Sequence, residues 1–524
     1  MIHPEQRISP LPNTVPEALR RAAERTPDAI AIEGEDGTTL TYAALQKEVL
    51  AAAKAFLAYG LKHGDRISIW APNMPAWIIV TIGAQVVGGV LVPLNTRLKG
   101  REASYILNRS RARLLFTVKG FLNTDYPALL ESESLPDLEK TILLQGSGPD
   151  SWAAFLALGE KVSDAQLAEA AAAVKGDDVS DILFTSGTTG KPKGAIATHT
   201  QVVRTYQAWV DFVGLRADDR YLIVNPFFHT YGYKAGWVAC LIAGATILPH
   251  AVFDAEAIIA RIAKNRVTVM PGPPTLFQSI LASKARPGAD LSSLRMCTTG
   301  AASVPRQLIE DMKHDLGFDV VVTAYGLTET NGTVSMCSAD DSIERVSTTA
   351  GRAIPGIEVR CVDAAGRDVA PGTPGEILVR GFNVMKGYLD DPKATAEAVD
   401  ADGWLKTGDI GIMDAEGYIR ITDRAKDLFI VGGFNCYPAE IEELLLDHPA
   451  IAQVAVIGVP DERMGEVCKA FVKLHSGQAL TEADLVAWSR THMANYKVPR
   501  FVEFVETFPT TASGKIQRFA LRAP

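Results

Sequence analysis

Short apolar runs alternate with amphipathic stretches up to about residue 350, and this alternation constrains the fold more than any other feature. Residues 66–70 form a strand-like run, and residues 74–87 a helical stretch. The same rhythm returns later, with strands expected at 221–224 and 267–270 on either side of a helix at 255–264. Strands that alternate with helices usually pair in parallel sheets whose faces the helices cover. The sequence therefore predicts an α/β fold.

The pattern changes in the last third of the chain. Residues 351–381 contain short strands between Gly/Pro turns, which indicates a small β-rich subdomain. A compact α+β segment follows. A chain of 524 residues exceeds what one core holds, so more than one domain is expected. We predict a large N-terminal domain, 1–424, made of two α/β-layered subdomains and the β-rich one, and a C-terminal domain, 425–524, with the boundary at 423–427.

Composition narrows the class of protein. The net charge of −9 argues against nucleic acid or an anionic membrane as the main partner. Six scattered cysteines without a CxxC pair favour reduced thiols. The start MIHPEQRISP lacks the apolar core of a signal peptide, and the longest apolar run, 76–94, is interrupted by Gly, Gln and Pro. We therefore expect a cytoplasmic protein without an integral membrane segment.

The stretch ILFTSGTTGKPKG, residues 182–194, follows an apolar run with interleaved glycines, hydroxyls and lysines. A glycine-rich turn after a buried strand presents backbone N–H groups to an anion. It is not a Walker A loop, because Gly187 is followed by TTGKPKG and Pro192 prevents a smooth entry into a helix. A flexible surface turn is the alternative, but the interleaved pattern favours a phosphate-binding loop.

Five motifs together resemble the adenylate-forming superfamily of acyl-CoA synthetases, peptide-synthetase adenylation domains and firefly luciferase. They occur in the family's order and are SGTTGKPKG (186–194), AYGLTET (324–330), GWLKTGDIG (403–411), DRAKDLFIVGGFNCYPAEIE (423–442) and PTTASGKIQR (509–518). The resemblance implies an enzyme that activates a carboxylic acid as acyl-AMP with release of pyrophosphate. It then transfers the acyl group to a thiol and releases AMP. ATP, Mg²⁺ and coenzyme A are the implied co-substrates and cofactor.

The resemblance also implies which residues bind ATP. Glu329 is the expected Mg²⁺ ligand with Thr185, because hard cations prefer oxygen donors; an exposed carboxylate at a helix start is its alternative. Thr328 is expected to donate to the α-phosphate and Tyr325 to cover adenine. The remaining expected ATP and AMP contacts are Ser186, Gly187, Thr188, Thr189, Gly190, Lys193, Gly300, Ala301, Ala302 and Gly326.

Three further residues complete the expected adenylation site. Asp409 would accept both ribose hydroxyls, although TGD alone is also an ordinary turn. Arg424 would reach ribose or phosphate. Lys515 would bridge the carboxylate and the α-phosphate, and this role rests wholly on the resemblance.

The second step requires the C-terminal domain to move, because one site cannot hold Lys515 and admit a thiol at once. Lys426 stands where the family has its hinge residue, and hinges are a few positions that absorb backbone change. Gly432 and Gly433 are expected to line the CoA tunnel, where side chains would block the thiol. A tight strand turn is the alternative explanation for the two glycines.

The segment NPFFHTYGYKAG, residues 225–236, resembles the family's acyl pocket. His229 would gate the carboxylate site, with a buried core imidazole as an equally good alternative. Tyr233, Lys234 and Gly300 would line the pocket. Lys234 stands in an apolar stretch, so we expect it to contact a ketone or second carboxylate of the acid, unless it is a surface lysine whose stem alone is buried.

The sequence of this segment, together with the stretches MPGPPTLFQS and VTAYGLTETNG, is also similar to that of bacterial CoA ligases for propionates left from steroid rings. Medium-chain fatty or aromatic acids are alternative substrates. Amino-acid-activating domains carry an aspartate in this region, which the sequence lacks.

An acyl-AMP ligase that loads a carrier protein and a silent nucleotide-binding regulator are rival functions. The regulator is disfavoured because Glu329, Asp409, Arg424 and Lys515 are all present. A homodimer is plausible for the family.

Overall fold

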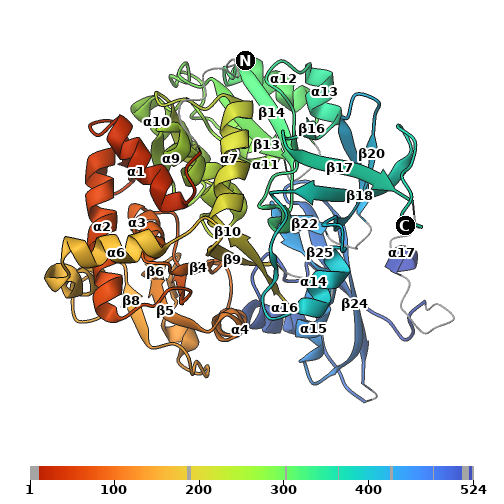
Figure 1. Cartoon of the computed structure of the whole chain (residues 1–524). Coiled ribbons are helices and arrows are strands. Elements are labelled where there is room, and N and C mark those ends of the chain that lie inside the picture. Colours follow the sequence, from red (N-terminus) through yellow and green to blue (C-terminus); the bar gives the residue numbers. More distant parts are fainter. Residues whose placement is uncertain are drawn as a thin grey trace.

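The structure is a computed structural model that describes most of the chain (Figure 1). The described residues are 11–185, 191–300, 304–363, 365–424, 429–475, 477–509 and 518–521. Strands alternate with helices through the first part of the chain, and the last part is a smaller α+β unit. The predicted α/β fold is confirmed.

A seven-stranded sheet forms the first layer of the N-terminal part. Its order is β19 (Gly387–Tyr388), β10 (Lys193–Thr198), β9 (Val179–Thr185), β4 (Val90–Pro93), β3 (Arg66–Trp70), β5 (Ala112–Thr117) and β8 (Lys140–Leu143). The strands from β9 to β8 are parallel, whereas β10 is antiparallel to both of its neighbours. This reversal lets β9 and β10 form a hairpin at the carboxyl end of β9.

A second sheet has two halves that meet through one residue. The first half runs β2 (Thr39–Thr41), β1 (Ile30–Glu33), β12 (Thr246–Pro249) and β11 (Arg220–Ile223). The second half runs β13 (Met296–Gly300), β14 (Val320–Tyr325), β15 (Ser335–Met336) and β16 (Arg352–Ala353). Val269 bridges β11 and β13, so the strand expected at 267–270 is reduced to this single bridging residue. On either side of it, the Thr268 N–H donates to the Arg220 carbonyl and the Met270 N–H to the Met296 carbonyl, so the contact with β11 and β13 continues beyond this residue.

Helices cover the two sheets and begin at short polar caps. Thr41 and Thr198 accept hydrogen bonds from the first turns of α2 and α7, as good N-caps do. The longer helices are α1 (Val15–Arg25), α2 (Tyr42–Tyr59), α3 (Pro75–Val86), α4 (Gly100–Ser110), α6 (Asp164–Ala173), α7 (His199–Val213), α10 (Ala255–Asn265), α11 (Pro274–Ala282) and α12 (Arg306–Asp315). Among the described residues, none of the helices has the length and apolar character that a membrane crossing requires.

The predicted β-rich subdomain is an antiparallel sheet. Its order is β17 (Ile357–Val362), β18 (Pro374–Gly381), β20 (Leu405–Met413) and β21 (Ile419–Arg424). The helix α14 (Pro392–Ala398) lies between β18 and β20 along the chain. The sheet shares its core with the two α/β sheets, since Ile377, Val379 and Leu405 belong to the same buried cluster as those sheets.

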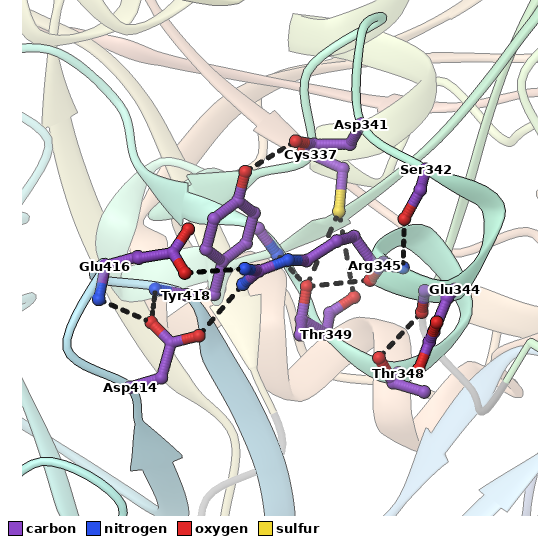
Figure 2. Close-up of polar contacts among 11 residues, drawn as sticks. Cys337, Asp341, Ser342, Glu344, Arg345, Thr348, Thr349, Asp414, Glu416 and Tyr418 are labelled. Atoms are coloured by element: carbon purple, nitrogen blue, oxygen red, sulfur yellow. Dashed lines mark hydrogen bonds and ion pairs between the residues drawn. The ribbon is translucent and has the colours of Figure 1, made fainter.

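An arginine clamp holds the β20–β21 turn against the short helix α13 (Ile343–Thr348) (Figure 2). Arg345 pairs with Asp414 at 2.9 Å and with Glu416 at 2.8 Å, and its guanidinium lies 4.1 Å from the centre of the Tyr418 ring. The Tyr418 hydroxyl donates to Asp341. These contacts fix the hairpin that carries Asp409.

The C-terminal part has its own core. It contains β22 (Phe429–Val431), β23 (Phe434–Cys436), α15 (Pro438–Leu446), β24 (Ile451–Asp461), β25 (Gly465–Leu474), α16 (Glu482–His492), β26 (Phe501–Phe504) and α17 (Arg518–Leu521). The helices α15 and α16 lie beside α4 of the N-terminal part (Figure 1), and Lys497 contacts Glu102 on that helix. Lys426, the predicted hinge residue, lies outside the described residues, so the boundary at 423–427 stays a prediction.

Asn73 joins the two α/β layers. It follows β3 of the first sheet and is 6% exposed. Its amide donates to the carbonyls of Ile223 and Asn225 at 3.1 and 3.0 Å, and its Oδ1 accepts from the Phe227 N–H at 2.8 Å. One side chain therefore satisfies three backbone groups of the segment that leads from β11 to His229.

We expect Asn73→Asp to destabilise the protein and to loosen this segment. The carboxylate still accepts from Phe227, but the Asn225 carbonyl loses its donor, a loss of about 1–3 kcal/mol. The Ile223 carbonyl loses one of its two donors and keeps the His250 N–H. Thermal unfolding should show a lower Tm than that of the wild type. Asn123→Asp, at an exposed position, is the matched control and should leave the Tm unchanged. Equal Tm values for both variants would contradict this role for Asn73.

Candidate functional site

The β9–β10 hairpin carries the predicted phosphate loop. Thr185 and Lys193 pair directly across the two antiparallel strands, so residues 186–192 connect them at one end of the hairpin. The Lys193 ammonium lies 5.3 Å from the centre of the Tyr388 ring, where it can make a cation–π contact. The hairpin thus presents the Thr185 hydroxyl and the Lys193 ammonium at the end where the loop connects its strands.

Several predicted site residues lie outside the described residues. They are Ser186, Gly187, Thr188, Thr189, Gly190, Ala301, Ala302, Lys426 and Lys515, together with the side chain of Arg424. The backbone of Arg424 pairs with Asp409 in the β20–β21 ladder. The roles assigned to these residues stay predictions.

Glu329 follows β14 and lies beside Thr185, at the loop end of this hairpin. It belongs to the short helix η5 (Thr328–Thr330), and its Oε1 accepts from the Tyr388 hydroxyl at 2.8 Å and from Thr185 at 3.4 Å. Burial, and then the Glu329 charge, raise the pKa of Tyr388, so its phenol stays a donor near neutral pH. A carboxylate half-buried beside the phosphate loop is well placed to hold a hard cation. Thr328 directly precedes it, and its role stays a prediction.

Tyr388 was not found from the sequence. It stands in the segment VMKGYLDD, whose composition contains no site-like pattern. Only the pairing of β19 with β10 brings its hydroxyl to Glu329.

Tyr325 and Asp409 meet from two different sheets. The Tyr325 hydroxyl, at the end of β14, donates to Asp409 of β20 at 2.6 Å. Asp409 is 9% exposed and its N–H donates to Thr407 Oγ1 at 3.1 Å. The predicted adenine and ribose residues are therefore neighbours, although 84 positions separate them.

Glycines bring the backbone of this region together closely. A Cβ at Gly326 would lie 2.3 Å from the carbonyl oxygen of Gly332, and one at Gly300 would lie 3.0 Å from that of Ala324. Real Cβ atoms do not approach backbone oxygen to 2.3 Å, so the tight turn after Tyr325 requires glycine at 326. Gly300 ends β13 directly beside Ala324 of β14.

His229 caps the short helix α8 (Thr230–Gly232), where its Nδ1 accepts from the Tyr231 N–H at 3.2 Å. The side chain is exposed, so it is not a sealed core imidazole. It nevertheless lies deep among protein atoms, and this loss of hydration lowers the pKa of His229 to about 4. The ring is therefore neutral near pH 7.

Lys234 lies at the junction of three site segments. Its ammonium is 2.8 Å from Asp181 of β9 and 2.8 Å from Asn331 Oδ1, just after η5. Lys234 and Asp181 are 1% and 0% exposed, which excludes a surface lysine. Burial lowers the pKa of Lys234, against the attraction of Asp181. The phosphate hairpin, the acyl segment and the Glu329 helix are thus tied to one cation.

The predicted acyl segment, 225–236, ends in a π-helix, η4 (Tyr233–Val238), which the sequence did not predict. Such segments are rare and often occur at functional sites. Tyr233 is fully buried, and its hydroxyl donates to Asp181 at 3.3 Å. Asp181 and Asn331 were also missed, because Asp181 lies inside an apolar strand and its partner is 53 residues away.

Gly432 and Gly433 form the turn between β22 and β23 with φ of +55° and +86°. These values favour glycine at both positions. A Cβ on Gly433 would lie 3.8 Å from Pro273, which directly precedes α11 of the N-terminal part. The two glycines therefore form a tight strand turn, and a side chain at 433 would reach the N-terminal part.

Removing either member of the Lys234–Asp181 pair should be strongly destabilising. Lys234→Met or Asp181→Asn leaves the other member buried without its main partner, which typically costs about 3–5 kcal/mol. Thermal and urea unfolding should show a much lower stability for each variant. Lys54→Met, which breaks an exposed pair with Asp164, is the control and should change little. Two near-wild-type single variants would contradict the role of the buried pair.

Two family models match most of the chain. The AMP-binding enzyme model matches residues 19–389, and the AMP-binding enzyme C-terminal domain matches residues 440–515. Two relatives, from Rhodococcus jostii and Mycobacterium tuberculosis, are each 47% identical and are named 3-[(3aS,4S,7aS)-7a-methyl-1,5-dioxo-octahydro-1H-inden-4-yl]propanoyl:CoA ligase. The alignment with the Rhodococcus jostii relative covers 98% of the chain and 98% of that relative. The alignment with the Mycobacterium tuberculosis relative covers 97% of the chain and 98% of that relative.

Solved structures agree with this relationship. A double mutant of o-succinylbenzoate CoA synthetase from Bacillus subtilis, bound with its product analogue OSB-NCoA, matches at a TM-score of 0.82 and 29% identity, over 96% of the chain and 98% of that protein. ATP-bound MatB from Rhodopseudomonas palustris matches at a TM-score of 0.67 and 29% identity, over 97% and 98%. The resemblance in the motifs is thereby confirmed: the chain belongs to the AMP-binding enzyme family and is an AMP-forming acyl-CoA synthetase.

Proposed function

We propose that this acyl-CoA synthetase activates a propionate carried on a keto-substituted bicyclic ring, the kind of acid that steroid-ring degradation leaves. The observation that carries the proposal is the 47% identity, over nearly the whole chain, to two ligases named for such an acid. Medium-chain fatty acids and aromatic acids are the alternative substrates. We also propose a cytoplasmic homodimer.

ATP would lie between the phosphate hairpin and β20. Lys193, Thr185 and the loop residues 186–190 would hold the β- and γ-phosphates, and Thr328 would donate to the α-phosphate. Tyr325 would cover adenine while Asp409 accepts the ribose hydroxyls, with Arg424 nearby. The proposal is supported by the two hydroxyls, of Tyr388 and Thr185, that converge on one carboxylate oxygen of Glu329.

Glu329 and Thr185 would hold Mg²⁺, because their oxygens are hard donors beside the triphosphate. The ion would neutralise the charge of the leaving pyrophosphate. Tyr388 keeps the Glu329 carboxylate oriented by donating to its Oε1.

The carboxylate of the acid would attack the α-phosphorus, and the bond to pyrophosphate would break. Lys515 would bridge the attacking oxygen and the α-phosphate. Rotation of the C-terminal domain about Lys426 would then bring Gly432 and Gly433 to the acyl-adenylate. The CoA thiolate would attack the acyl carbon, and AMP would leave with the C–O bonding pair.

The acyl group would lie against His229, Tyr233, Lys234 and Gly300. Two of the three Lys234 protons are directed to Asp181 and Asn331. The third would donate to a ring ketone of the acid. The imidazole of His229 would lie beside the carboxylate of the acid. Because the ring is neutral, it would not form an ion pair with that carboxylate.

Glu329→Gln should lower acid-dependent pyrophosphate release by at least about 100-fold, the scale of losing one preorganised charge-stabilising group. The Mg²⁺ concentration needed for half-maximal activity should also rise, because an amide is a weaker ligand for a hard cation than a carboxylate. Initial rates measured over a Mg²⁺ series check both effects. Glu344→Gln, an exposed change on α13, should match the wild type. An unchanged Mg²⁺ dependence of Glu329→Gln would exclude Glu329 as the ligand.

A panel of acids tests the substrate proposal. CoA-dependent AMP release should be fastest with the dioxo-octahydroindenyl propionate, slower with its counterpart lacking the ketones, and slower with octanoate and benzoate. The preference for the diketone should shrink in Lys234→Met, assayed at a temperature where the variant stays folded. Faster turnover of octanoate or benzoate would refute the steroid-remnant proposal, and an unchanged preference in the variant would remove Lys234 from the acyl site.

A further inference from the structure

A lysine and two glutamates form a buried cluster where the C-terminal part meets the N-terminal part. The Lys497 ammonium lies 2.7 Å from Glu102 and 2.8 Å from Glu440. The side chains of Lys497, Glu102 and Glu440 are only 3%, 7% and 7% exposed. Glu440 and Lys497 belong to the C-terminal part, whereas Glu102 stands in the first turn of α4.

The cluster lies within a larger contact between the same two parts. Arg97 packs over the Phe434 ring at 4.8 Å, and Phe434 stacks on Tyr496 at 4.7 Å. The Asn95 amide donates to the Tyr496 hydroxyl at 3.4 Å. The segment 95–102, directly after β4, is therefore the docking surface for the C-terminal part.

The pKa of Lys497 shifts in the opposite direction from that of Lys234. Burial lowers the pKa of Lys497, but Glu440, Tyr496 and Glu102 outweigh it, so the net pKa rises well above its usual value. Lys234 has one carboxylate partner, and there burial prevails. Lys497 is therefore a permanent cation, and both of its carboxylate partners contribute to holding it.

Only one of these two contacts depends on how the domains are arranged. Lys497 and Glu440 share a domain and would stay paired in any orientation. Glu102 is on the other domain, and rotation would separate it from Lys497 while its Oε2 kept the Lys99 N–H, 2.9 Å away in this structure. A contact shifts a conformational equilibrium only if it differs between the two states. The Glu102–Lys497 pair meets this condition and the Glu440–Lys497 pair does not.

In the arrangement seen here Gly433 faces the N-terminal part, since a Cβ at this position would lie 3.8 Å from Pro273. The TM-score is 0.82 with the relative that holds a CoA product analogue and 0.67 with the ATP-bound relative, at the same identity. Both observations associate the docked Glu102–Lys497 pair with the CoA-dependent half of the reaction.

We infer that Glu102 is a positioning residue that, through Lys497, selects the domain orientation for acyl transfer to CoA. This inference rests on the proposed domain rotation. Glu102 touches no substrate and acts only through the equilibrium between the two orientations. Its removal should therefore separate the two half-reactions.

The test compares Glu102→Gln with the wild type in each half-reaction. Pyrophosphate–ATP exchange without CoA reports adenylation, and single-turnover transfer from preformed acyl-adenylate to CoA reports the second step. We expect exchange to stay within about twofold and transfer to fall at least about tenfold, because a buried charge pair across an interface is lost. Arg101→Gln removes an exposed pair with Asp447 at the same interface and should change neither rate more than about twofold.

The outcomes are distinct. An equal fall in both half-reactions would assign Glu102 a general structural role and overturn the inference. Unchanged transfer, or a fall in exchange alone, would overturn it as well. Glu440→Gln serves as a second comparison, because its pairing does not depend on orientation and should not separate the two rates selectively. A wild type that shows no exchange with any acid would instead mark a failure of the proposed function.

Discussion

The buried contact of Lys234 with Asp181 and Asn331 is the interaction on which the site depends. Each of its members belongs to a different functional segment: the strand before the phosphate loop, the π-helix of the acyl segment and the turn after Glu329. In a dry interior an ammonium that loses one partner leaves the other charge uncompensated. The three segments are therefore energetically coupled, and the predicted ATP and acyl residues that they carry are held together.

Lys234 and Lys497, the two buried lysines in the described part of the chain, are arranged differently. Lys234 joins segments of one domain, so its partners are fixed whatever the C-terminal domain does. Lys497 joins two domains, with one carboxylate partner on each. The first arrangement rigidifies a site, whereas the second makes a charge pair conditional on domain position. A synthetase that performs two successive reactions in one site needs both a rigid acid and nucleotide site and a movable cover.

Much of the fold follows from local pattern. Alternating apolar runs and helices predicted the parallel strands β3 and β11, the helix α3 and the β-rich subdomain, since burial on both faces leaves a visible sequence signature. The segment expected as a strand at 267–270 contacts both β11 and β13, with Val269 as its bridging residue. In the site, motif residues such as Glu329, Asp409 and Tyr325 were predicted from the sequence, and two of them proved to be neighbours. Tyr388, Asp181 and Asn331 were not, because each acts through a partner distant in the chain.

The sequence by itself determined the family and the order of the motifs, and it predicted which residues bind ATP, since these features lie in short contiguous stretches with defined chemistry. Only the tertiary structure decided which of those residues meet, that His229 is exposed rather than sealed, and that Lys234 and Lys497 are buried ion-pair centres. Burial and pairing depend on the packing of segments separated by up to 395 positions, as for Glu102 and Lys497. No local pattern records such contacts, because the loss of hydration and the stronger attraction between buried charges arise only after the chain has folded.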